Sequence, residues 1–394
     1  MAAIVVRHGR RDPLILEPGP GANAVELAGP EGVESAAAEA LVAHAITAPA
    51  DGPPLPAFAV PGDRVAVALA GPLPQPEPVV AALAAALGSS GVDRADVSVL
   101  VAAAPSGRLP AGATVFDGHR TGETSYLAAD EAGHPLHLAR TLVDADLVVE
   151  VGAHRYDPAL GAVDPRGALW PAFGRSDCAE ACARAVALRG RRALPGWRST
   201  VERMRWELGV GAVLRLVPGR HGTLHAACFG TPAAAARAAR SHAVAWRPRV
   251  TTPARLAVAT LSETSVPETL VRAVAAASRV TRPDATICLV GAIPPPGPVF
   301  TRWRDGVAVR ALVEEAVASG NAEWIADAAR TRLCARALGA RRVVLLCDLD
   351  DALVEDLDFG NARTPEAVER LAARAESLVV LHEADLLWPH RAGT

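Results

Sequence analysis

The sequence predicts an α/β fold: two α/β domains with mostly parallel sheets that flank an interdomain cleft. The chain has 394 residues, which is long enough for two or three domains with large cores. Hydrophobic residues make up 50 % of it, so a disordered chain is not expected. Short apolar runs rich in Val, Ile and Leu alternate with helical patterns, which is typical of parallel sheets covered by helices.

The first part of the chain opens with two short strands, residues 2–6 and 14–17, which we expect to form a ribbon. The segment after them is rich in Gly and Pro and is expected to be a loop. Thr231 precedes an alanine-rich run and is expected to cap a helix there. The other helices expected in this part are 31–46, 78–88, 176–189 and 198–208, and the expected strands include 96–104 and 147–151.

The best candidate for a domain boundary is R-P-R-V-T-T-P at residues 247–253, where two prolines interrupt the pattern. It divides the chain into an expected N-terminal domain, 1–250, and an expected C-terminal domain, 251–394. Strands and helices alternate again beyond it. The expected strands are 255–261, 286–291, 342–347 and 378–382, and the expected helices are 266–280, 308–319, 321–338 and 364–375.

Composition excludes some classes of partner. The formal net charge is −3, which gives no reason to expect nucleic acid as a partner. No apolar run approaches the length that spans a membrane, and the start does not resemble a signal peptide, so we expect a cytoplasmic protein with no membrane partner. All 40 basic residues are arginines, so no side-chain amine is available for a covalent link to a cofactor.

The six cysteines are scattered, as buried structural thiols are. Only Cys178 and Cys182 are spaced so that both thiols share one face of a helix. Two such residues without a second pair indicate a metal site only weakly, and small buried residues on a helix are the alternative.

Candidate site residues follow the expected strand 147–151, where the chain enters a loop rich in Gly, Pro and Asp. In open α/β sheets, ligands bind beyond the carboxyl ends of the strands. The polar side chains of this loop are therefore the first candidates for chemistry, and a polar crossover loop without function is the alternative. They are His154, Arg155, Asp157, Asp164 and Arg166.

The same region resembles the nickel-pincer lactate racemase family. Its framework is similar at Ala145-Asp146-Leu147, at Gly152 and at Ala168-Leu169-Trp170-Pro171, with no gap between these anchors. Pro61-Gly62-Asp63-Arg64-Val65 resembles the family's N-terminal pattern, and the similarity in order and spacing covers nearly the whole chain. The resemblance implies lactate racemase-like N-terminal and C-terminal domains. That family interconverts the two hands of 2-hydroxy acids by moving hydride to a pincer cofactor.

The active-site residues of the family are not kept. In register with it, one histidine falls on Asp157, and the lysine that carries the covalently attached nickel-pincer nucleotide falls on Gly167. The metal-binding histidine falls on Ala183, beside Cys182, whose thiolate would be a competent nickel ligand. A second lysine falls on Arg272, which suits a carboxylate or phosphate. We expect Arg166 and Arg272 both to face the cleft, where they are either paired with acids such as Asp117, Asp157 or Glu263 or open to an anionic ligand.

Two strand ends differ from the family as well. Its D-H-T-R-P-x-P motif is replaced by residues 70–76, which keep the prolines and lose all four polar groups. A catalytic histidine is replaced by Ser106, and a hydroxyl with an ordinary high pKa is a poor acid or base near neutral pH. Asp117, at the end of a further strand, is retained.

These replacements favour a degenerate member, a pseudoenzyme that has lost nickel-pincer racemase activity and keeps the cleft as a binding or interaction scaffold. The alternative is a retooled isomerase, a racemase or epimerase of another small hydroxy acid, with a non-covalent cofactor or a different metal. Which cofactor it uses is unknown, and the expected partner is a small anionic ligand in the cleft. The candidate residues are His154, Asp157 and Asp117 for catalysis, Arg166 and Arg272 for cofactor binding, and Cys182 for metal.

Overall fold

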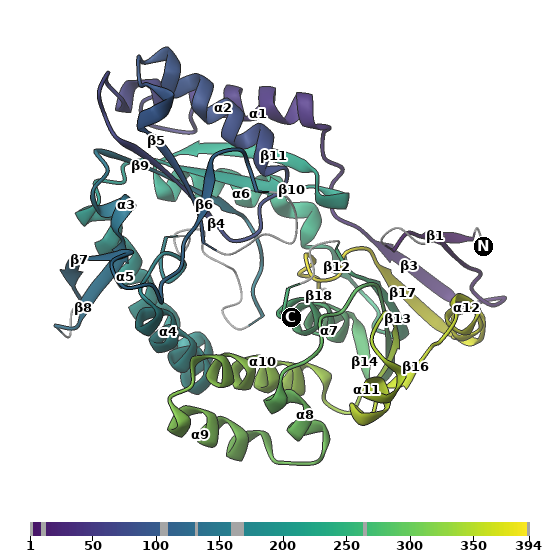
Figure 1. The fold of residues 1–394 in the computed structure, drawn as a ribbon. Coiled ribbons are helices and arrows are strands. Elements are labelled where there is room, and N and C mark those ends of the chain that lie inside the picture. Colours follow the sequence, from purple (N-terminus) through teal and green to yellow (C-terminus); the bar gives the residue numbers. More distant parts are fainter. Residues whose placement is uncertain are drawn as a thin grey trace.

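The structure is a computed structural model of the chain, and it describes residues 3–8, 13–102, 109–130, 133–158, 169–262 and 266–391. Two sheets form its core, and each is flanked by helices (Figure 1). The predicted fold class, two α/β units with mostly parallel sheets, is confirmed.

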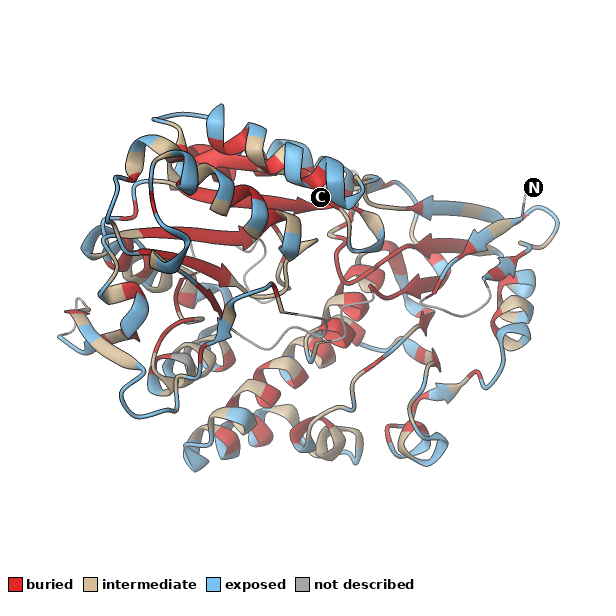
Figure 2. Ribbon diagram, turned by 45° about the horizontal axis from the view of Figure 1, so that its top comes forward, coloured by how far each residue is buried: buried red, intermediate tan, exposed pale blue. Residues whose placement is uncertain are grey.

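The first sheet has six strands in the order β11-β10-β9-β4-β5-β6. Its strands are parallel, except that β10 and β11 form an antiparallel pair at one edge. The central strands are buried on both faces, which explains their near-continuous apolar sequences (Figure 2). The bounds are β4 Val65–Ala70, β5 Val97–Val101, β6 Ala113–Val115, β9 Leu147–Ala153, β10 Val213–Pro218 and β11 Leu224–Gly230.

Helices cover both faces of this sheet. On one face lie α1 (Ser35–Thr47) and α2 (Pro76–Ser89), whose apolar side chains share a core with the strands. On the other face, the Thr231 side chain accepts a hydrogen bond from the backbone N–H of Ala234, so the predicted cap of α6 is confirmed. The elements of that face are the hairpin of β7 (Thr124–Ala129) and β8 (Pro135–Ala139), α3 (Arg140–Val143), α4 (Ser176–Arg189), α5 (Leu194–Glu207) and α6 (Pro232–His242).

The second sheet also has six strands, in the order β16-β15-β14-β13-β17-β3, and its described pairings are all parallel. Its strands are β3 Asn23–Leu27, β13 Ala254–Thr260, β14 Thr281–Val290, β15 Arg342–Leu346, β16 Gly360–Asn361 and β17 Ser377–Leu381. Its helices are α7 Thr269–Val280, α8 Pro298–Arg304, α9 Val309–Ser319, α10 Ala322–Leu338, α11 Asp351–Asp356 and α12 Pro365–Arg374. Within the described ranges, no helix of either unit is long and apolar enough to cross a membrane.

Strand β3 comes from the Gly- and Pro-rich segment that we expected to be a loop, so that expectation is wrong. It pairs with β17 at the edge of the second sheet. The ribbon of β1 (Ile4–Val6) and β2 (Leu14–Leu16) forms as predicted and packs on the same sheet. The start of the chain thus lies with the second sheet rather than with the expected domain 1–250, and the division at residue 250 otherwise stays a prediction.

Several contacts join the two units. Helix α4 packs on α10, and the guanidinium group of Arg332 donates hydrogen bonds to the carbonyl groups of Ala187 and Leu188 at the end of α4. Near residue 250, β12 (Arg249–Val250) pairs with β18 (His390–Arg391). The segments that follow β9 and β13 also meet, since Asp157 lies 4.0 Å from Arg272 of α7.

Candidate functional site

Each sheet has a point at which the order of its strands reverses. In the first sheet, β4 has β5 on one side and β9 on the other; in the second, β13 has β14 on one side and β17 on the other. Ligands of open α/β sheets bind at such switch points, beyond the carboxyl ends of the strands. The segments after β9, β13 and β17 are therefore the places to look for a site.

Aromatic contacts hold the loop after β9 against the second unit. The ring of His154 is buried and lies edge-on to Tyr156, with ring centroids 5.3 Å apart. Tyr156 stacks on Trp388 at 6.3 Å, and it belongs to a hydrophobic cluster to which both units contribute. Arg155 and Asp157, the two neighbours of Tyr156 in the chain, are consequently placed at the boundary between the units.

Buried hydrogen bonds fix the ends of β13 and β17. The backbone N–H and the hydroxyl of Ser262 both donate to the carboxylate of Asp385, at 2.8 and 2.6 Å. The backbone N–H of Glu383 donates to the hydroxyl of Thr260 at 2.9 Å. Because buried polar groups need such partners, these bonds hold Asp385 in one position at the switch point.

Arg155, Asp157, Arg272 and Asp385 form a charged group that we call the junction cluster. Nη2 of Arg272, on α7, lies 4.0 Å from Oδ2 of Asp157, and these side chains are only 16 % and 21 % exposed. Burial and then the charge of Arg272 lower the pKa of Arg155 to about 10, while Asp385 opposes the shift. The positive charge of Arg272 thus disfavours the charged form of Arg155. Both Nε atoms are buried without a hydrogen-bond partner among the described groups.

Cys182 lies on α4 beside the junction cluster. Burial and the negative charge of Asp157 raise the pKa of its thiol to about 12, so the thiol is protonated at neutral pH. The thiolate is the form that binds metals. Among the residues that the structure describes, no three or more His, Cys, Asp and Glu side chains are grouped to hold a metal ion.

The structure brings together four predicted site residues, since His154, Asp157, Cys182 and Arg272 all lie in or beside the junction cluster. Asp117 lies elsewhere, in an exposed turn after β6.

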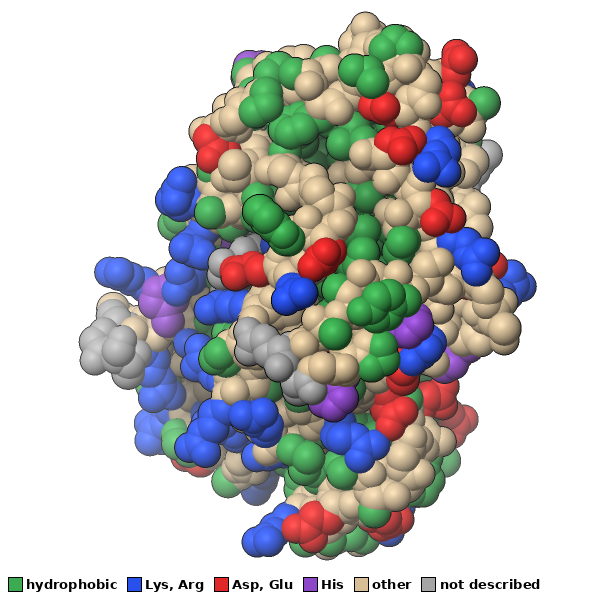
Figure 3. Space-filling model, turned by 90° about the vertical axis from the view of Figure 1, so that its left-hand side faces the viewer, with side chains coloured by type: hydrophobic (Ala, Val, Ile, Leu, Met, Phe, Trp, Pro, Cys, Tyr) green, Lys and Arg blue, Asp and Glu red, His purple; other side chains and the backbone are tan. Residues whose placement is uncertain are grey.

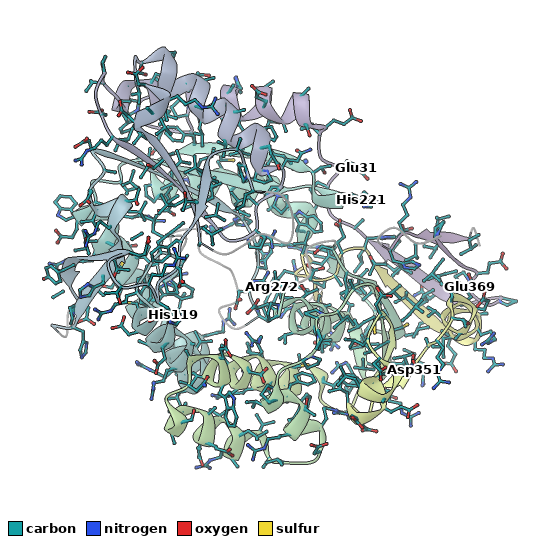
Figure 4. The ribbon with its side chains drawn as sticks, in the orientation of Figure 1. Glu31, His119, His221, Arg272, Asp351 and Glu369 are labelled. Carbon is teal, nitrogen blue, oxygen red and sulfur yellow. The ribbon has the colours of Figure 1, made fainter. Side chains whose placement is uncertain are left out.

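In that turn the carboxylate of Asp117 accepts a hydrogen bond from the backbone N–H of His119 at 2.9 Å and lies 3.8 Å from Arg120. In Figure 4, Arg272 is labelled near the middle of the molecule and His119 to its lower left. A catalytic role for Asp117 stays a prediction. Arg166, Asp164 and Glu263 lie outside the described residues.

Sequence reasoning missed Ser262, Asp385 and Trp388. The signal for Asp385 was available, because His382, Glu383 and Asp385 follow an expected strand just as the candidate loop follows residues 147–151. The partnership with Ser262 joins segments more than a hundred residues apart, and no local pattern indicates it.

Arginine side chains are unevenly spread over the surface. On the face seen in Figure 3 they gather along the left-hand side, at mid-height and below. Since the chain has no lysine, all of these cations are guanidinium groups. The surface therefore contains basic areas that the overall charge of −3 does not indicate.

The fold is similar to solved structures along its whole length. The lactate racemase apoprotein from Thermoanaerobacterium thermosaccharolyticum aligns with a TM-score of 0.74 and 14 % identity, covering 99 % of this chain and 100 % of that one. A Thermotoga maritima protein, a structural genomics target, aligns with a TM-score of 0.65 and 10 % identity, covering 92 % of this chain and 100 % of that one.

No protein-family model matches the chain, and no curated protein matches it at a significant level. The structural similarity confirms, at the level of the fold, what the resemblance implied: the chain has the fold of lactate racemase. Identities this low show the fold alone, because one fold serves many activities.

Proposed function

We propose that the chain is a lactate racemase-like protein that binds a small carboxylate, such as a 2-hydroxy acid, at the junction cluster and does not carry out nickel-pincer racemisation. The observation that carries this proposal is the partly buried Arg272, which lies 4.0 Å from Asp157 at the junction of the two sheets, together with the positive charge of Arg155 two residues before Asp157.

The acids of the cluster compensate these two cations only in part. Asp157 lies 4.0 Å from Arg272, which is too far for a hydrogen bond. The carboxylate of Asp385 already accepts two hydrogen bonds from Ser262. An anion between the two arginines would accept hydrogen bonds from both and would reduce their repulsion, and guanidinium groups bind a carboxylate in a bidentate manner.

The residues present do not fit the covalent nickel-pincer nucleotide that the resemblance implies. The chain has no lysine to form the covalent link. The thiol of Cys182 is protonated, and the described residues offer no group of three metal-ligating side chains around it. Hydride transfer to a tethered pincer is therefore not part of the proposed function.

A retooled isomerase is the second candidate, and the position of Asp157 favours it. The carboxylate of Asp157 lies 4.0 Å from Arg272, one of the two cations that would hold the carboxylate of a substrate, and a general base would act there. An isomerase would convert one hand of a bound hydroxy acid into the other, whereas a binding scaffold would not.

Calorimetric titration tests the binding site with lactate, glycolate and malate as probes. We expect wild-type protein to bind at least one of them, and Arg155→Gln and Arg272→Gln to weaken binding about tenfold or more, equivalent to about 1.4 kcal/mol. The matched control is Arg336→Gln, which removes an exposed arginine of α10 and should bind as the wild type does.

Failure of every probe to bind, or equal affinity in Arg272→Gln and wild-type protein, would contradict the proposal. Chiral analysis of lactate after incubation with the protein separates the two candidates, because only the isomerase produces the opposite hand.

A further inference from the structure

A second group of arginines lines a groove of about 460 Å³ where the chain passes from one unit to the other. We call it the linker groove. Arg237 and Arg240 come from α6, Arg247 from the segment that follows α6, Arg249 from β12, and His390 from β18. No acidic residue is among the residues that line it. The groove thus combines four guanidinium groups from two neighbouring segments.

These four arginines form no ion pair within the described part of the chain. Other exposed arginines do have acidic partners: Arg302 lies 2.6 Å from Glu315, and Arg310 lies 2.9 Å from Glu314. The charge in the linker groove is therefore uncompensated by protein groups. A concave surface lined by one sign of charge concentrates the opposite ion.

An aromatic stack holds one of the cations in place without a carboxylate. The guanidinium carbon of Arg247 lies 5.5 Å from the centroid of the Tyr156 ring, and Tyr156 stacks on Trp388. Arg279 lies 4.4 Å from the Trp388 centroid. A cation–π contact of this kind positions Arg247 and leaves its positive charge uncompensated by a carboxylate.

The positive charge of the linker groove also affects neighbouring groups. Burial lowers the pKa of Arg279, and the charges of Arg191 and Arg247 lower it further. The ring nitrogen Nδ1 of His390, at the wall of the groove, is buried without a hydrogen-bond partner among the described groups. A polar atom of this kind is expected to have a partner when the site is filled.

We propose that the linker groove binds a small ligand that carries two or more phosphate groups. Its volume lies within the range of about 300–1,000 Å³ that is typical of small-molecule sites. A single carboxylate would match only one of the four charges, whereas a diphosphate or triphosphate carries several, and guanidinium groups bind phosphate oxygens in a bidentate manner. The residues that line the linker groove do not include any member of the junction cluster, and this proposal does not depend on the proposed function of that cluster.

Calorimetric titration with inorganic phosphate, pyrophosphate and triphosphate at physiological salt tests this proposal. Affinity should rise by about tenfold or more from phosphate to triphosphate, since more charges are matched. Arg240→Gln and Arg237→Gln change exposed residues of α6, so they should fold normally, and each should weaken triphosphate binding by about tenfold. Arg336→Gln is the control with the same loss of charge, and it should leave the affinity unchanged.

Three outcomes would overturn the proposal: no triphosphate binding, an equal loss in Arg336→Gln and Arg240→Gln, or tight binding of a single-stranded oligonucleotide with none of triphosphate. The last result would identify the groove as a nucleic-acid surface. Arg272→Gln should keep triphosphate affinity, which separates this site from the junction cluster.

Discussion

Oδ2 of Asp157 lies 4.0 Å from Nη2 of Arg272, and the two residues follow strands of different sheets. Asp157 belongs to the loop after β9 of the first sheet, and Arg272 to the helix after β13 of the second. The contact is an ion pair at the limit of its range, partly buried and too long for a hydrogen bond. Arg272 can therefore bind another anion, and that anion would compete with Asp157 for the guanidinium group.

Asp157→Asn should increase the affinity of the junction cluster for a carboxylate probe by about tenfold, because it removes this competing charge and keeps the shape of the side chain. Calorimetric titration measures the change. Asp284→Asn is the control, since Asp284 pairs with Arg282 at an exposed position. Weaker binding by Asp157→Asn would mean that Asp157 holds the ligand rather than competing with it.

The fold could be predicted largely because its elements have strong local signals. The expected helix 176–189 matches α4, and Thr231 caps α6 as expected. Strand β3 was missed because it is short, mostly exposed and surrounded by Gly and Pro. Its identity as a strand depends on pairing with β17, more than three hundred residues away, and such a partnership has no local signal.

Only the part of the candidate site that follows β9 could be predicted from the sequence. The rule that ligands bind beyond strand ends led to His154 and Asp157, which do lie at the junction. The same rule placed Asp117 at a strand end, but β6 lies at the edge of its sheet, away from the switch point. Asp385 joins the candidate site only through its hydrogen bonds with Ser262 and the effect of its charge on Arg155, which depend on the tertiary structure.

Glu150 offers a test of stability that does not depend on function. Its fully buried carboxylate accepts hydrogen bonds from Arg205 of α5, at 2.7 and 2.6 Å, and from Arg215 of β10. Removing one member of a buried ion pair leaves an uncompensated charge, which costs about 3–5 kcal/mol. Urea denaturation of Glu150→Gln should show a loss of this size in the free energy of unfolding.

The control for this experiment is Glu314→Gln, which breaks an exposed pair with Arg310 and should change the free energy of unfolding by about 0–1 kcal/mol. If Glu150→Gln proved as stable as Glu314→Gln, the buried network would not contribute as the structure indicates.

Cys182 should be unreactive in the native protein. Burial and the charge of Asp157 raise the pKa of its thiol to about 12, and only the thiolate reacts with iodoacetamide. Alkylation at pH 8 followed by peptide mass analysis should show Cys182 unmodified in native protein and modified after unfolding in urea. Rapid native labelling would contradict this expectation and would show that the thiol is accessible as a thiolate, the form that binds metals.

His382 should make the stability of the protein depend on pH below neutrality. Its buried ring lies 2.7 Å from Oε1 of Glu26 on β3, and burial lowers its pKa from the ordinary value of 6.5, while Glu26 opposes the shift. Below pH 6.5 the unfolded chain then binds this proton more readily than the folded chain does, so stability is lost as the pH falls toward the folded pKa.

The melting temperature between pH 5 and pH 8, which spans the ordinary range of histidine titration, measures this loss. His382→Gln should flatten the decrease on the acidic side, and the exposed His119→Gln should retain it. Glu26→Gln is a second test. Without the opposing carboxylate the His382 ring is harder to protonate, so the decrease in melting temperature on acidification should be larger. The opposite result would be a wild-type protein that becomes more stable on acidification through this range, with no such gain in Glu26→Gln. It would mean that the pair with Glu26 outweighs burial and raises the pKa of His382 above its ordinary value.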